Sequence, residues 1–131
     1  MAQLSIELIL VRQLASGLAI PTFVADASGT LVFINEPAER LLGVRFDELG
    51  DTPFDAWTTG FAPADADGER VAPDDLPLAI ALHERRPAHG QLRIVGHDGV
   101  PRSIEITAFP LESAHGHLEG GVAMFWEVTG P

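Results

Sequence analysis

Residues 22–43 constrain the fold most, because two short apolar runs and a tight turn stand directly before a helical segment. The runs Thr22 to Ala25 and Leu31 to Ile34 are rich in β-branched and aromatic residues, which predicts two strands. Asp26 and Gly29 suit a hairpin between them, since glycine accepts a positive φ and an aspartate carboxylate can cap the turn. The pattern therefore predicts an antiparallel pair of strands.

Asn35 and Gly43 delimit the next element. An asparagine side chain can accept a hydrogen bond from a free N–H at a helix start, and a glycine often follows a helix end. We therefore expect a short helix at Pro37 to Leu42. Three further segments are expected: short helical turns at 45–62, a Pro/Asp/Gly-rich loop at 63–77, and a helix from Asp74 or Asp75 to Glu84.

The last third of the chain has the pattern of antiparallel strands. Ile104, Ile106 and Ala108 alternate with polar residues, which is typical of a half-buried strand. In the final strand both faces are apolar, and we expect Met124 to face the helices while Ala123 and Phe125 face away from them. The expected strands are Gln91 to Val95, Arg102 to Pro110 and Leu118 to Val128.

The N-terminal segment is amphipathic. Its apolar residues recur at spacings of three and four, so they form one stripe of a helix: Leu4, Leu8, Val11, Ala15 and Leu18. Two arrangements fit this stripe, a helix packed on its own sheet and a helix shared with a second subunit. The elements together predict an α+β fold, with a five-stranded antiparallel sheet, short helices on one face and the amphipathic helix on the other.

Composition narrows the choice of partners. The 131 residues include 19 acidic and 8 basic side chains, which give a formal charge of -11. Such a charge repels phosphate backbones and anionic lipids, so neither nucleic acid nor a membrane is an expected partner. The chain has no Cys, hence no disulfide, thiolate metal site or cysteine nucleophile, and this fits a cytoplasmic protein.

The order of these elements resembles the PAS domain family from about Ala19 to Thr129. The residues that carry the resemblance are Asp26, Gly29, Asn35, Ala38, Gly43, Glu48, Leu49, Pro77, Leu78, Ala81, Leu82, Gly90, Asp98, Gly99 and the Glu127-Val128-Thr129 run. The resemblance implies a sensory and dimerisation module in which sheet and helices enclose a small cavity. We expect an N-terminal helix at 1–18 and a PAS-like sensor domain at 19–131.

An apolar cavity is the expected ligand site. Its expected lining is drawn from Ile34, Leu41, Phe46, Phe54, Trp57, Phe61, Ile80, Leu92, Ile104, Ile106 and Met124. The same residues would serve equally well as a packed core, so the sequence leaves a small apolar ligand and a filled interior open. Arg93 or Arg102 could anchor a carboxylate if either side chain points inward.

Coloured cofactors are not expected. Flavin and yellow photoreceptors of the PAS family use a cysteine, which this chain lacks. Haem sensors of the family carry an axial histidine near the start of the long helix, whereas His83 lies near its predicted C-terminal end. His115 and His117 with Glu112 and Glu119 read as a loop rather than a metal site, and Asp65 to Glu69 reads as a solvated turn rather than a calcium loop.

These observations favour a non-enzymatic signalling module. No nucleophile and base pair, phosphate-binding loop or metal constellation is visible, so no catalytic or metal residue is assigned. We expect a homodimer that contacts a signalling partner or effector domain, with an interface at Leu4, Leu8, Val11, Leu18 and Phe125. The alternative is a small-molecule or cofactor receptor, haem included, with an occupied cavity.

Overall fold

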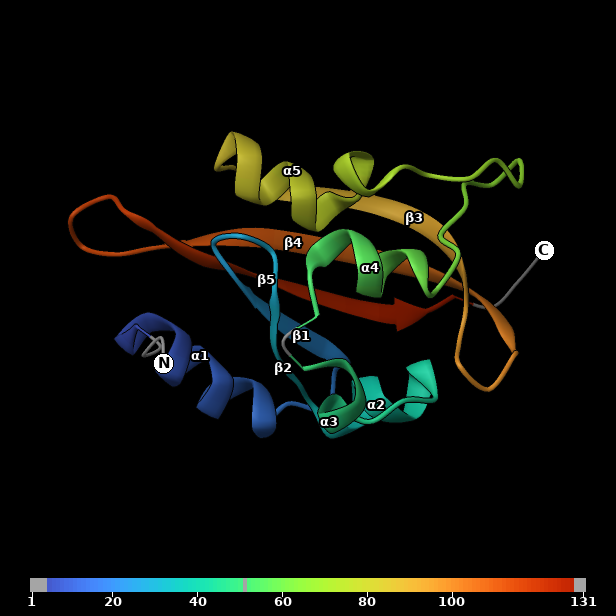
Figure 1. Ribbon diagram of the computed structural model, residues 1–131, viewed down its shortest axis with the longest axis horizontal. Coiled ribbons are helices and arrows are strands. Elements are labelled where there is room, and N and C mark those ends of the chain that lie inside the picture. Colours follow the sequence, from blue (N-terminus) through green and yellow to red (C-terminus); the bar gives the residue numbers. More distant parts are fainter. Residues whose placement is uncertain (1–4, 51, 129–131) are drawn as a thin grey trace.

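A five-stranded antiparallel sheet with the strand order β2-β1-β5-β4-β3 is the centre of the computed structural model, which describes residues 5–50 and 52–128 (Figure 1). The strands are β1 (Thr22–Asp26), β2 (Leu31–Ile34), β3 (Ala88–Val95), β4 (Pro101–Glu112) and β5 (Leu118–Glu127). The helices are α1 (Ile6–Ser16), α2 (Glu36–Leu42), α3 (Phe46–Leu49), α4 (Phe54–Thr59) and α5 (Pro77–Glu84), with a 3-10 turn η1 (Pro73–Asp75). The predicted α+β fold with its five-stranded sheet is confirmed.

The β1–β2 hairpin forms as its turn residues predict. One carboxylate oxygen of Asp26 accepts hydrogen bonds from the backbone N–H groups of Ser28 and Thr30, both at 3.0 Å. Gly29 has a φ of 89°, which a side chain would strain. These contacts close the turn and fix the pairing of the two strands.

Asn35 ties four segments together from a fully buried position. Its Oδ1 accepts from the backbone N–H of Thr22 at 2.9 Å and of Ala38 at 3.1 Å, so it joins the start of β1 to the N-terminus of α2. Its Nδ2 donates to the carbonyl oxygens of Ala15 at 3.0 Å and Ile20 at 2.8 Å. The predicted helix cap is therefore confirmed, and the same side chain also holds the end of α1.

The helix expected from Asp74 or Asp75 begins later, at Pro77. Residues Pro73–Asp75 form the separate turn η1, and Leu76 is extended with a ψ of 147°. A residue before proline is disfavoured in the helical region because the proline ring clashes with its backbone. The predicted start was therefore wrong, while the predicted end at Glu84 is confirmed.

Strand β3 is longer than predicted and its outer edge is covered. It begins at Ala88, which pairs with Ala108 of β4. On the other side Ala64 and Arg93 exchange backbone hydrogen bonds of 2.9 and 2.8 Å, and the N–H of Val95 donates to the carbonyl of Phe61 at 2.9 Å. The first part of the 63–77 loop is thus anchored to the sheet edge, which leaves less of that edge open for pairing with another chain.

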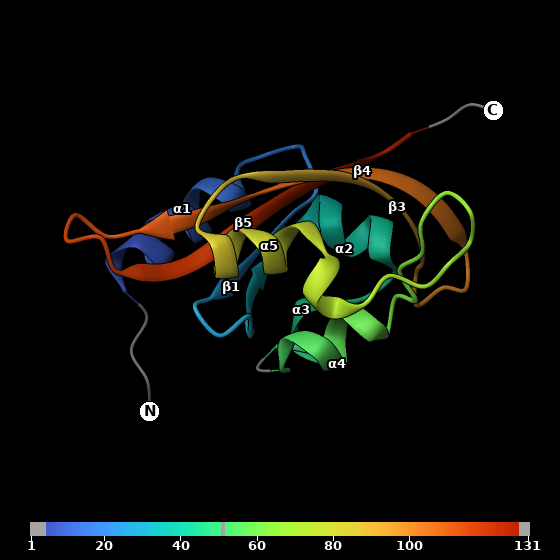
Figure 2. The ribbon, with the colours of Figure 1, turned by 90° about the horizontal axis from the view of Figure 1, so that it is seen from above.

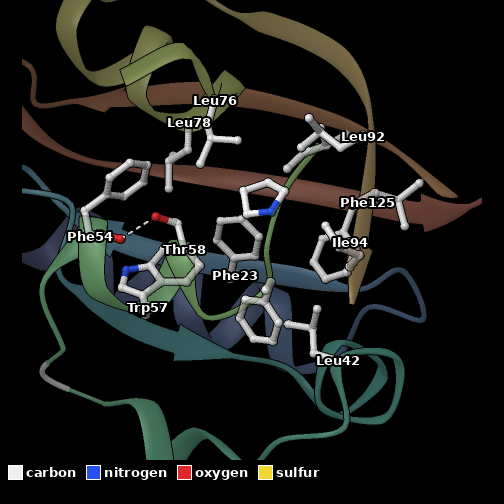
Figure 3. A pocket seen from close by; sticks show the side chains of 14 residues that line it. Phe23, Leu42, Phe54, Trp57, Thr58, Leu76, Leu78, Leu92, Ile94 and Phe125 are labelled. Atoms are coloured by element: carbon white, nitrogen blue, oxygen red, sulfur yellow. Dashed lines mark hydrogen bonds between the residues drawn. The ribbon is translucent and has the colours of Figure 1, made fainter. Parts of the chain in front are cut away.

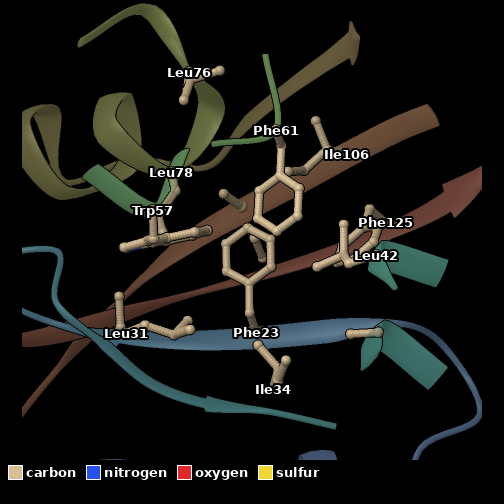
Figure 4. Close-up of a cluster of buried hydrophobic side chains, with 14 of the residues drawn as sticks. Phe23, Leu31, Ile34, Leu42, Trp57, Phe61, Leu76, Leu78, Ile106 and Phe125 are labelled. Atoms are coloured by element: carbon tan, nitrogen blue, oxygen red, sulfur yellow. The ribbon is translucent and has the colours of Figure 1, made fainter. Parts of the chain in front are cut away.

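The two faces of the sheet are covered by different elements. Helices α4 and α5 lie on one side, the inner face, and α1 lies on the other, the outer face (Figure 2). Ala123 and Phe125 pack on the inner face with Phe23 and Trp57 (Figure 4). The predicted faces of β5 were therefore inverted: Met124 packs on the outer face with α1, and Phe125 is core. Because β5 is central and covered on both sides, apolarity could not tell its faces apart.

Helix α1 packs on its own sheet. Leu8 and Ala15 are buried against Val24 and Val122, while Val11 is half-buried beside them. Leu4 lies outside the described residues. Across residues 5–50 and 52–128, no helix has both the length and the hydropathy needed to cross a bilayer.

Gly120 and Gly121 allow helices to approach β5 from both sides. A Cβ on Gly120 would overlap the carbonyl oxygen of Ala25 and come within 2.9 Å of Leu8 on α1. A Cβ on Gly121 would come within 2.8 Å of Leu78 on α5. Neither site has room for a methyl group unless its neighbours shift.

Candidate functional site

A cavity of about 60 Å³ lies on the inner face, between the sheet and helices α4 and α5 (Figure 3). The strands supply its floor, and α4, the 61–63 segment and the start of α5 supply its walls. The lining residues are Phe23, Leu42, Phe54, Trp57, Thr58, Phe61, Pro63, Leu76, Leu78, Leu92, Ile94, Ile104, Ile106 and Phe125. The described part of the inner face therefore contains a partly open apolar pocket within a packed core.

The structure brings part of the predicted lining together. Six predicted residues line the cavity: Phe54, Trp57, Phe61, Leu92, Ile104 and Ile106. Ile34 is buried in the core outside the cavity, and Leu41 and Phe46 pack against that core. Ile80 is half-buried on α5 and does not line the cavity, and Met124 lies on the outer face.

Sequence reasoning missed eight lining residues: Phe23, Leu42, Thr58, Pro63, Leu76, Leu78, Ile94 and Phe125. The alternation of β3 could have identified Ile94, because it lies two residues after Leu92 on the same face. No such signal existed for Phe23, since Thr22, Phe23, Val24 and Ala25 are all buried. Leu76 was missed because the predicted helix began too early, at Asp74 or Asp75, and so included this residue.

Trp57 organises the aromatic end of the pocket. Its ring meets Phe23 edge to face with centroids 5.0 Å apart, and Phe54 in the same manner at 5.6 Å. The Nε1–H of Trp57 donates to the carbonyl oxygen of Gly29 at 3.1 Å. This contact fixes α4 against the β1–β2 turn, and a Cβ on Gly29 would come within 2.7 Å of Phe54.

The polar atoms of the lining side chains already have partners. The hydroxyl of Thr58 donates to the carbonyl of Phe54 at 2.7 Å, within α4. The indole N–H of Trp57 donates to the carbonyl oxygen of Gly29. The remaining lining side chains are hydrocarbon, so no titratable group of the described chain lines the cavity.

Arg102 lies on the inner face, one pair of strand positions beyond the pocket. It pairs in register with Ile94 and precedes Ile104 by two residues. Its Nη2 donates to Asp98 at 3.3 Å and its Nε lies 3.9 Å from a carboxylate oxygen of Glu127. Nη1 is buried, and the described residues offer it no hydrogen-bond partner.

Arg93 differs from Arg102, since it is exposed. Beside Arg102, the backbone N–H of Val100 and then the guanidinium of Arg102 hold the pKa of Asp98 below its ordinary value. Of the two arginines considered from the sequence, only Arg102 therefore lies next to the pocket.

Neither the histidines nor the acidic turns form a site. His83 is exposed near the end of α5 and does not line the cavity, and His115 and His117 are exposed in the β4–β5 turn. Asp65 uses one oxygen to accept from the N–H groups of Asp67 and Glu69, both at 2.9 Å. Within the described ranges, no three His, Asp or Glu side chains gather in a way that could hold a metal ion.

The fold of the chain is similar to that of solved PAS structures. The PAS domain of BvgS from Bordetella pertussis has a TM-score of 0.66 and 19% identity, over 95% of this chain and 87% of that chain. The PAS domain of nitrogen regulation protein NR(II) from Vibrio parahaemolyticus has a TM-score of 0.63 and 15% identity, over 91% and 98%. The Rhodobacter sphaeroides LOV protein has a TM-score of 0.74 and 15% identity, over 95% and 69%. At these identities the likeness shows the fold alone.

A family model described as PAS fold matches residues 16–130. The chain therefore belongs to the PAS family, and the resemblance stated from the sequence is confirmed. PAS domains are sensory signalling modules and are generally non-catalytic. No curated protein matches the chain.

Proposed function

We propose that this PAS domain works as a homodimer that passes a signal to a partner protein or effector domain, with an N-terminal segment at 1–18, which contains α1, beside a sensor domain at 19–131. The observation that carries the proposal is an apolar stripe on the outward side of α1. Ile6, Leu10 and Leu14 are 66%, 57% and 63% exposed and recur every four residues. Because they share one helix face, they form a continuous exposed surface of a kind that often marks an interaction site.

The outer face of the sheet offers a surface for this stripe to contact. Helix α1 covers β1, β2 and parts of β4 and β5, whereas Gln91, Arg93 and Val95 of β3 are exposed. Trp126 near the end of β5 is 38% exposed on the same face. We propose that the stripe of each α1 packs on the open part of the partner's outer face, in a two-fold symmetric contact.

The proposed interface differs from the one drawn from the sequence. Leu8 is buried by its own sheet and Phe125 by the core, so neither is available to a second subunit. Val11 and Leu18 are half-buried and can lie at the rim. Ile6, Leu10 and Leu14 take the central positions instead.

Sedimentation velocity at micromolar concentration tests the dimer. The intact chain should sediment as a dimer, and Leu10→Glu should convert it to a monomer with little change in melting temperature, because Leu10 contacts little of its own subunit. Arg12→Gln is the matched control, since it makes the same change of one charge unit at an exposed position on the opposite side of α1 from the stripe, and it should leave the dimer intact. A monomeric intact chain, or a Leu10→Glu protein as dimeric as the parent, contradicts the proposal.

A second candidate function, small-molecule reception, is favoured by the cavity itself. The cavity is apolar, and Phe23 of β1 lines it. The preceding residue, Thr22, donates its backbone N–H to the side chain of Asn35. A ligand there is therefore close to the residue that holds α1. A haem receptor fits poorly, because no histidine of the described chain lines the cavity and about 60 Å³ is far below the roughly 300 Å³ of the smallest usual ligand pockets.

The signalling partner is proposed at the level of class. One similar structure is a PAS domain of a nitrogen regulation protein, and regulation of another polypeptide is what we propose here too. A cytoplasmic location is part of the same proposal. Mass spectrometry of proteins cross-linked to the chain in its own cells tests it: loss of the cross-linked partner in Leu10→Glu but not in Arg12→Gln supports coupling between dimer and partner.

A further inference from the structure

We infer that the inner-face cavity admits only small, uncharged and wholly apolar molecules, from a single xenon atom up to a ring the size of benzene. This inference rests on the ligand-reception part of the proposed function, for which it names the chemical class. It is carried by three features of the pocket: its size, the state of its polar groups, and the position of the nearest charge.

Size sets the upper limit. A cavity of about 150 Å³ lined by apolar side chains holds benzene or xenon and stays dry. The present cavity has about 60 Å³, so it accepts an atom the size of xenon directly and a six-membered ring only after a side chain moves.

Phe54 is the side chain that can make this room. Of the described lining residues, Phe54 alone is partly exposed, whereas the others are buried. We therefore place Phe54, on α4, at the opening of the cavity, where a turn of its ring toward solvent would break its contact with Trp57 and leave the strand residues of the floor in place. The opening and the capacity of the cavity are thus set by one ring.

Hydrogen bonding sets the polarity limit. The indole N–H of Trp57 and the hydroxyl hydrogen of Thr58 are already donated to backbone carbonyls. A carboxylate brought into the cavity would lose its bonds to water and find no free donor, and a hydroxyl would find neither donor nor acceptor, because the wall exposes almost no polar surface to the enclosed space. Benzene should therefore bind at least about tenfold more tightly than phenol, although the two rings have nearly the same shape.

Arg102 is the one nearby group that argues for an anionic ligand. Its Nη1 is buried without a partner in the described chain, but the rest of its guanidinium is engaged by Asp98 and Glu127. Arg102 does not line the cavity, whereas its neighbours Ile94 and Ile104 do. The formal charge of -11 further disfavours an anion.

A series of probes of matched shape tests the inference. Xenon binding is followed by the chemical shift of dissolved xenon, and benzene, phenol and benzoate binding by the shift in melting temperature and by chemical-shift changes of Trp57. Xenon and benzene should bind, while phenol and benzoate should bind at least about tenfold more weakly than benzene. Equal or tighter binding of phenol or benzoate overturns the inference, and tight benzoate binding that is lost in Arg102→Gln identifies an anion site instead.

Two variants locate the binding. Ile106→Phe adds volume inside the cavity and should abolish xenon and benzene binding, whereas Phe54→Ala removes the ring at the opening and should strengthen benzene binding. If Ile106→Phe fails to fold, the Phe54→Ala result still decides, because unchanged benzene binding there contradicts the assigned role of Phe54. Absence of binding by every probe overturns the inference, while the dimer proposal stands or falls separately by sedimentation without any ligand.

Discussion

The inner and outer faces of the sheet are both apolar, but the elements that cover them leave different amounts of apolar surface exposed. On the inner face the large side chains are enclosed by α4 and α5, and the polar atoms of the pocket side chains are paired. On the outer face α1 covers part of the sheet and leaves its own stripe of Ile6, Leu10 and Leu14 exposed. The inner face is thus covered within one subunit apart from the pocket opening, whereas the outer face leaves an exposed apolar stripe, which in our proposal a second subunit covers.

The neighbours Phe125 and Trp126 provide the largest test of this contrast. Phe125 is 1% exposed on the inner face, so Phe125→Ala should lower the free energy of unfolding by about 3–5 kcal/mol. Trp126 is 38% exposed on the outer face, so Trp126→Ala should change the stability of the monomer far less, while weakening dimer formation. Urea denaturation together with sedimentation measures both effects. Similar losses of stability for the two variants contradict the distinction between the faces.

Asn35 is the next test, because it connects the two faces. Asn35→Ala removes a helix cap and leaves buried backbone groups without partners, so a loss of about 2–4 kcal/mol is expected in chemical denaturation. Asn35→Asp retains an acceptor for Thr22 and Ala38 but loses both donors to the end of α1. Hydrogen exchange should therefore show faster exchange of α1 in Asn35→Asp, with α2 largely protected. Equal exposure of both helices contradicts a separate role for the amide donors.

Leu8 and Leu10 lie on different sides of α1, so substitutions at these two positions test the two sides separately. Leu8 is buried against the sheet, and Leu8→Ala should cost about 2–3 kcal/mol of stability at low protein concentration. Leu10→Ala should change that value by less than about 0.5 kcal/mol, because its side chain is exposed. A rise in stability with protein concentration that Leu10→Ala abolishes would sharpen the assignment of the outer face to a dimer. Equal effects at low concentration argue against it.

Asp98 gives the smallest expected effect, and a pH-dependent one. Its pKa is lower in the folded chain than its ordinary value of 3.8, so ionisation of Asp98 favours the folded state above that pH. This contribution is lost as the pH falls below 3.8 and through the folded pKa. Asp98→Asn should therefore be slightly less stable than the parent at neutral pH and match it in acid, as measured by urea denaturation. A difference that persists unchanged in acid contradicts this origin.

Local signals in the sequence were sufficient for most of the fold. Asp26, Gly29, Asn35 and Gly43 each act through their own backbone or that of nearby residues, so their roles could be predicted from type and spacing. These turn and cap contacts are decided within a few residues of the chain, whereas the bonds of Asn35 to Thr22, Ala15 and Ile20 depend on the tertiary fold. The strand order β2-β1-β5-β4-β3 was not among the predictions, since the sequence and the family resemblance predicted only a five-stranded antiparallel sheet.

The faces of β5 and much of the pocket could not be predicted in this way. Both sides of β5 are covered, so alternation between polar and apolar residues, which is the usual signal for a face, is absent there. Phe23 and Leu78 meet across the cavity only because the sheet and α5 pack together, and nothing near either residue records that contact. Arg102 was considered for the pocket, but its pairing with Asp98 depends on the folded β3–β4 turn.

At Gly120 and Gly121, helices from both faces of the sheet come close to the backbone of β5. Leu8 of α1 and Leu78 of α5 approach adjacent backbone units of β5 from opposite sides, with no β5 side chain between either helix and the strand. At most other positions of the sheet a side chain separates strand from helix and can absorb a small displacement by changing rotamer, although Gly90 of β3 also lies close to Pro77 of α5. At this point the leucine side chains of α1 and α5 pack directly on the peptide backbone of β5, so a shift of either helix toward the strand meets backbone atoms that have no rotamer to change.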